Sequence, residues 1–127
     1  MEAFLLIAVV IIGGVLLIQM AQGRQNKAIQ QRAHDDVADA VADARRWIER
    51  LGSQVLSIAG SDTASTQAMA DASERYNAAS SQISTANTVK QAQLARESAL
   101  EGLHYVAAAR EIMGMPAGPE LPPLEGQ

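Results

Sequence analysis

The chain has 127 residues, of which 48% are apolar and 19% are charged, and it contains no cysteine. This length suits about one ordinary domain and excludes most enzyme folds. The formal charge of −4 comes without a cluster of Lys and Arg, so the composition argues against nucleic acid as a partner. Without cysteine there is no disulfide, no thiolate metal ligand and no thiol nucleophile.

The N-terminal segment is almost purely apolar. No residue from Ala3 to Gly23 is charged, and as a helix this stretch rises about 30 Å, the thickness of a bilayer core. We expect residues 1–23 to be a transmembrane anchor rather than a cleaved signal peptide, because a basic n-region is missing and the apolar stretch is long. The large apolar residues assigned to this anchor are Phe4, Leu5, Leu6, Ile7, Ile11, Ile12, Leu16 and Leu17.

The charges beside this anchor predict its orientation. Arg24, Lys27 and Arg32 follow it, whereas Glu2 precedes it. Because Lys and Arg stay on the cytoplasmic side of a membrane, we expect a single-pass protein of the plasma or inner membrane whose remaining chain is cytoplasmic.

Residues 24–114 have the pattern of a coiled-coil-like helical domain. All four prolines lie after Met115, and the apolar residues recur at alternating spacings of three and four. Gly60 is expected to stop the first helix, and Ser61 and Asp62 to begin the second. The apolar seams of these two helices are Val37, Val41, Ala44, Ile48, Leu51, Val55 and Ile58, then Met69, Ala72, Tyr76, Ala79, Ile83 and Ala86.

A third helix is expected to begin at Thr88, which forms a capping box with Gln91, and to end at Gly114. It carries two apolar faces, so it is expected to have two neighbours. The main arc consists of Ala92, Ala95, Ala99, Leu103, Val106 and Met113, with Leu100 and Ala107 at its margin, and the second stripe of Leu94, Tyr105 and Ile112.

The sequence therefore predicts an all-α protein. An N-terminal transmembrane helix would continue into, or be followed by, an antiparallel three-helix hairpin or bundle. The Pro-rich residues 115–127 would form an extended or disordered tail.

Few residues suggest chemistry. Asp35, Asp36 and Asp39 have the spacing of a diphosphate-binding Mg²⁺ motif, but the chain is too short for the helical cavity that such enzymes need. His34 and His104 lack companions at the spacing of a metal site. We therefore predict no catalytic, cofactor-binding or metal-binding residues, and interpret the aspartates as a solvated face.

A short basic run surrounds the single tryptophan. Arg45, Arg46 and Arg50 beside Trp47 could contact anionic headgroups or an acidic partner. The simpler interpretation is an intrahelical network, in which Arg45 pairs with Glu49 and Arg46 with Asp43.

The first functional hypothesis is a non-enzymatic membrane protein whose helical domain associates with itself or with a membrane-protein partner. Membrane lipid is the other expected partner, through the anchor. Helix pairing is assigned to Trp47, Ile48, Leu51 and Val55, and contact with an outside partner to Leu94, Tyr105 and Ile112. The alternative is an accessory protein that binds lipid or an apolar ligand at the membrane surface, which predicts a cavity.

Three stretches of the sequence resemble a family of small actinobacterial membrane proteins of uncharacterised function. They are ARRWIERLGSQVLSIAGSD (44–62), ADASERYNAASSQISTANT (70–88) and ARESALEGLHYVAAAREIMGMPAGPELPP (95–123). Together they cover about half of the chain. The resemblance implies an N-terminal anchor, a helical region and a Pro-Gly-rich exit, with no catalytic residues.

Overall fold

The computed structural model describes the backbone of residues 2–125 and the side chains of residues 27–125. Within this range the chain forms three α-helices and no strand: α1 (Glu2–Ser57), α2 (Thr63–Ser84) and α3 (Val89–Ile112). The chain divides into two units, Met1–Asp36 and Val37–Gln127, and the second contains all the packing described below. The predicted all-helical class is confirmed.

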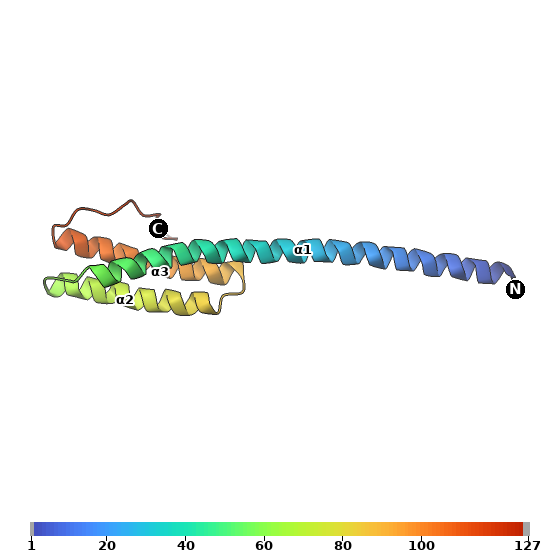
Figure 1. Cartoon of the computed structure of the whole chain (residues 1–127), viewed down its shortest axis with the longest axis horizontal. Coiled ribbons are helices and arrows are strands. Elements are labelled where there is room, and N and C mark those ends of the chain that lie inside the picture. The colour runs from blue at the N-terminus through green and yellow to red at the C-terminus, as the bar shows by residue number, and fades with distance from the viewer. Residues whose placement is uncertain (1, 126–127) are drawn as a thin grey trace. The chain divides into compact units, whose positions relative to one another are not determined.

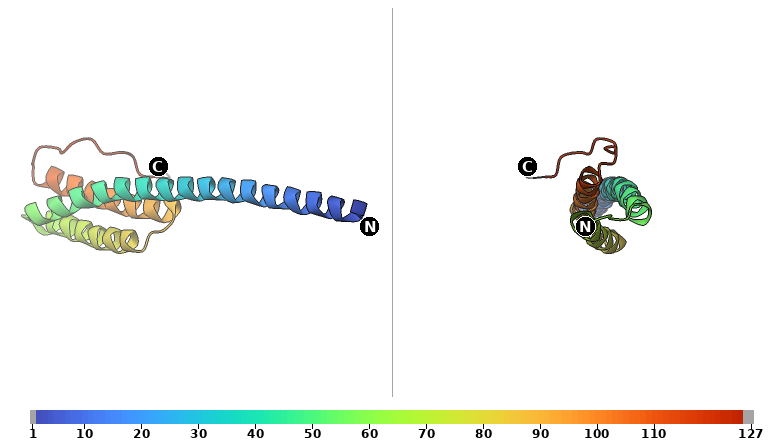
Figure 2. Two further views of the ribbon diagram at one scale, coloured as in Figure 1. Left: turned by 45° about the vertical axis from the view of Figure 1, so that its right-hand side comes forward. Right: turned by 90° about the vertical axis from the view of Figure 1, so that its left-hand side faces the viewer.

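The second unit is an antiparallel three-helix bundle. From Val37 onward α1 runs beside α3, and α2 returns in the opposite direction (Figures 1 and 2). Short connections at 58–62 and 85–88 join the helices, which favours antiparallel neighbours.

The predicted anchor lies outside the described side chains, so the residues from Phe4 to Leu17 assigned to it stay a prediction. Among residues 27–125, whose side chains the structure describes, no helix is long and apolar enough to cross a membrane.

The heptad pattern locates the core of the bundle. Leu51, Ala72 and Ala99 near the centres of the seams are fully buried, whereas Tyr76 of α2 is partly buried against the core. The ends of the seams, such as Val37 and Ala86, are only partly buried. The buried seam residues are Ala44, Ile48 and Leu51 of α1, Met69, Ala72, Ala79 and Ile83 of α2, and Ala92, Ala95, Ala99, Leu103 and Val106 of α3.

Glycine allows the helices to approach closely. A Cβ atom at Gly102 of α3 would overlap the side chain of Leu51 on α1, and one at Gly52 of α1 would lie 2.7 Å from the ring of Tyr76 on α2. The spacing of the apolar residues in the sequence did not indicate these glycine contacts.

The start of α2 follows the predicted cap. Asp62 is the N-cap, and its carboxylate accepts the Ser65 backbone N–H at 2.7 Å, while Ser65 Oγ accepts the Asp62 backbone N–H at 3.1 Å. This reciprocal pair satisfies N–H groups that have no partner within the helix.

The cap of α3 differs from the prediction in one bond. Thr88 Oγ1 accepts the Gln91 N–H at 3.1 Å as expected, but the Gln91 side chain accepts the backbone N–H of Asn87 at 2.8 Å rather than that of Thr88. The end of α3 is a Schellman motif, in which Gly114 has a φ of +69° and the Met115 N–H donates to the Arg110 carbonyl at 2.9 Å.

The Pro-rich tail has no regular secondary structure and runs back along α3, on the side away from α2 (Figures 1 and 2). Leu121 and Leu124 are partly buried against the core. The tail therefore contacts the bundle, which the sequence did not indicate. Its disorder stays a prediction.

Candidate interaction surfaces and a cavity under the tail

The predicted helix-pairing residues pack inside the bundle, against other helices of the same chain. Leu51 is fully buried and Ile48 is 6% exposed, while Trp47 and Val55 are partly buried against the core. Most of their apolar surface is therefore already buried within the bundle.

Trp47 is surrounded by cationic side chains from two helices. The guanidinium carbons of Arg46, Arg50 and Arg96 lie 5.8, 5.5 and 5.9 Å from the centre of its ring. At this separation the negative face of an indole attracts a cation. The Trp47 Nε1–H is buried and has no hydrogen-bond partner among the described residues, so the ring is held by packing and by its cationic neighbours.

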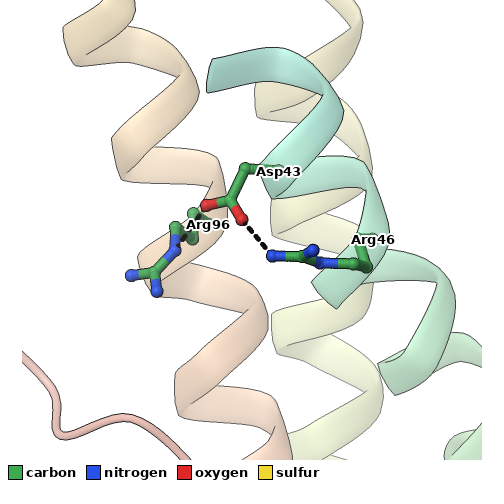
Figure 3. Close-up of polar contacts among 3 residues, drawn as sticks. All are labelled: Asp43, Arg46 and Arg96. Atoms are coloured by element: carbon green, nitrogen blue, oxygen red, sulfur yellow. Dashed lines mark hydrogen bonds and ion pairs between the residues drawn. The ribbon is translucent and has the colours of Figure 1, made fainter. Parts of the chain in front are cut away.

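One carboxylate connects two of these arginines (Figure 3). Asp43 Oδ1 forms an ion pair with Arg46 Nη2 of its own helix at 2.6 Å, and Asp43 Oδ2 forms one with Arg96 Nε of α3 at 2.8 Å. The predicted Asp43–Arg46 pair is confirmed, whereas no Arg45–Glu49 ion pair occurs in the described part of the chain. Arg96 joins α3 to α1, a contact that spacing along one helix could not reveal.

The second stripe of α3 is exposed. Leu94, Tyr105 and Ile112 expose 50%, 39% and 46% of their surfaces. Beside this stripe, α3 is tied to α2 by the Ser98 hydroxyl, which donates to Gln82 at 2.7 Å, and by the 3.3 Å ion pair of Glu101 with Arg75. The stripe therefore lies outside the bundle core. The sequence predicted a second neighbour of α3 on this face, and within the bundle the face is exposed.

A cavity of about 270 Å³ lies between α1, α3 and the tail. α1 contributes Arg50 and Gln54, and α3 contributes apolar residues together with His104 and Arg110. Residues 117–121 of the tail complete the wall.

Three side chains of α3 hold the tail. Arg110 donates to the Pro116 carbonyl at 3.3 Å, and His104 Nε2 lies 3.3 Å from the Pro122 carbonyl. Because a carbonyl only accepts, a hydrogen bond between these two atoms requires the proton on Nε2. Further along, the Glu125 backbone N–H donates to the Glu97 carboxylate at 2.8 Å.

The remaining chemical candidates are not among the residues that line this cavity. Asp35, Asp36 and Asp39 are exposed on α1, as is His34. Within residues 27–125 no group of three or more metal-ligating side chains could hold a metal ion. His104 acts as a tether for the tail, a role that its isolated position in the sequence did not suggest.

Asp62 is the one carboxyl group among the described residues whose pKa is clearly shifted. The hydroxyl and the backbone N–H of Ser65 both donate to its carboxylate, which lowers the pKa of Asp62 from its ordinary value of 3.8. This shift belongs to the cap of α2.

No family model, curated protein or solved structure matches this chain. The resemblance to the actinobacterial membrane family therefore stays a prediction.

Proposed function

We propose that this chain is a non-enzymatic, single-pass membrane protein whose helical bundle binds a protein neighbour in the membrane. The neighbour is either another copy of this chain or a different membrane protein. Anchoring both in one bilayer raises their effective concentration, so a modest contact area is sufficient.

The exposed stripe of α3 is the observation that carries this proposal. Leu94 and Tyr105 are 11 residues apart, and Tyr105 and Ile112 are 7 apart; both spacings are close to whole helical turns, so the three residues share one face. An apolar residue exposed by itself needs no explanation, but an aligned set of them is typical of a contact surface. The helix-pairing residues of α1 are occupied within the bundle, which leaves this face for a neighbour.

Site-specific photo-crosslinking in native membranes tests the proposal. A photoreactive residue in place of Tyr105 is expected to give a defined crosslinked product, identified by mass spectrometry as this chain or another protein. The matched control is the same residue in place of Asn77, which is exposed on α2.

Leu94→Ser should remove the Tyr105 product while the thermal melt of the helices stays unchanged, because half of this side chain is already in solvent. Equal crosslinking from positions 77 and 105, or a Tyr105 product that survives Leu94→Ser, contradicts the proposal.

We further propose that residues 1–23 anchor the chain and that the bundle is cytoplasmic, on the basis of Arg24, Lys27 and Arg32. Because the chain has no cysteine, Ala64→Cys introduces a single thiol at an exposed position of α2. A membrane-impermeant thiol reagent should label it only after the cells are lysed. Labelling in intact cells contradicts this orientation.

The second candidate function is the binding of an apolar ligand at the membrane surface. The cavity between α1, α3 and the tail favours it, since that hypothesis predicts a cavity with apolar walls.

A further inference from the structure

The cavity under the tail has chemically different walls. On the α1 side Arg50 and Gln54 lie one helical turn apart, and Arg110 of α3 donates to the Gln54 side chain at 2.5 Å. Elsewhere the lining is apolar, with Leu103 and Val106 of α3 and Leu121 of the tail. We propose that this cavity binds a short alkyl carboxylate, whose carboxylate is held by Arg50 and Arg110 and whose chain lies against the apolar wall.

The charge of the site selects an anion. Among residues 27–125 no carboxylate is within ion-pair distance of Arg50 or Arg110, and the acidic residue of the lining is Glu120 in the tail. A guanidinium has five N–H donors. Arg110 uses one of its terminal nitrogens for Gln54 and the other for the Pro116 carbonyl, so donors remain for a ligand. A planar carboxylate matches the geometry of such donors.

The volume of the site limits the ligand. At about 270 Å³ the cavity is slightly smaller than most ligand pockets, which start near about 300 Å³. A single short chain suits this space better than the two long chains of a phospholipid.

The tail forms part of the site. The carbonyls of Pro116 and Pro122 are held by Arg110 and His104, and the segment between these two prolines lines the cavity. Both ends of the lining segment are thereby fixed to α3. Arg110 has two roles, since it holds the tail and faces the ligand.

The inference rests on the second candidate function and is independent of the exposed stripe of α3. Its test uses the full chain in phosphatidylcholine vesicles, with hexanoate as the anionic probe and 1-hexanol as the neutral one. Each probe carries a radiolabel, and the amount that sediments with the vesicles, above the amount that sediments with vesicles lacking the chain, measures its binding.

We expect saturable binding of hexanoate. The concentration for half-saturation should be about tenfold higher for 1-hexanol, and about tenfold higher for hexanoate with Arg50→Gln or Arg110→Gln, because each change removes a charge-assisted contact. Arg75→Gln is the matched control, since Arg75 pairs with Glu101 away from the cavity, and it should leave binding unchanged.

Circular dichroism confirms that each variant is folded, and Arg50→Gln tests the site without removing a hydrogen bond of the tail. Equal binding of hexanoate and 1-hexanol overturns the carboxylate site but leaves the second candidate function standing. Binding of neither probe overturns both. Wild-type half-saturation in either arginine variant also overturns the carboxylate site.

Discussion

The connection between α1 and α2 depends on one residue without a side chain. The sequence predicted that Gly60 stops the first helix, but α1 ends earlier, at Ser57, and the glycine with a positive φ in the described chain is Gly114. A Cβ atom at Gly60 would instead overlap the backbone of Thr66 in the first turn of α2. Gly60 is thus required for a close approach between two segments.

Gly60→Ala should therefore destabilise the bundle by about 1–3 kcal/mol, because backbone atoms of Thr66 must shift to accept the methyl group. Urea unfolding followed by circular dichroism measures this loss. Gly118→Ala is the control, since a Cβ atom there meets nothing within 4 Å. Similar midpoints for the two variants would show that the turn tolerates a side chain.

The cap of α2 gives the bundle a specific dependence on pH. Ser65 lowers the pKa of Asp62 from 3.8 in the folded state, so folding favours the ionised carboxylate. This contribution to stability is present above the unfolded pKa and is lost as the pH falls through the lowered folded value.

Asp62→Asn keeps an acceptor for the Ser65 N–H but removes the titration. Wild type should have the higher urea midpoint at pH 7, and this advantage should shrink as the pH falls below 3.8, the ordinary pKa. A difference in midpoint that is equal at pH 7 and pH 2.5 contradicts this role of the ionised group.

At the scale of the helices, the seven-residue pattern predicted which faces are buried. A helical face follows from local geometry, so the spacing of Ile48, Leu51 and Val55 was sufficient to place them toward the core. The caps at Asp62 and Thr88 were equally local. The contacts of Asp43 with Arg96 and of His104 with the tail were not predictable, because they depend on how separate segments meet.

The same distinction between local patterns and contacts of separate segments applies to the candidate site. The exposed stripe of α3 could be identified from its periodicity alone. The cavity could not, because its lining combines α1, α3 and a Pro-rich segment whose path is set by hydrogen bonds to Arg110 and His104.

Two leucines of α1 allow a matched test of its buried face. Leu51 is fully buried, whereas Leu56 is 90% exposed. Leu51→Asp should cost more than the roughly 2–5 kcal/mol of a buried Leu→Ala change, because it also buries a carboxylate. We expect loss of the cooperative thermal melt for Leu51→Asp and a nearly unchanged melt for Leu56→Asp. Equal melts would place α1 outside the core.

At the scale of the whole molecule, the helical bundle follows a proposed membrane anchor in the chain. The core of the bundle is rich in alanine, which contributes little apolar area per residue, so its stability is expected to be modest. A neighbour on the exposed stripe of α3 would add to the stability of such a bundle. Tethering both proteins to one bilayer would keep that neighbour close.

Alkaline carbonate extraction of membranes tests the proposed anchor most directly. The full chain should stay in the membrane pellet with its N-terminus intact. A variant with Ile11→Asp and Ile12→Asp should move to the supernatant, because each aspartate costs about 2.5–3.5 kcal/mol at the centre of a membrane helix. Recovery of the unaltered chain from the soluble fraction, shortened at its start, would contradict the account.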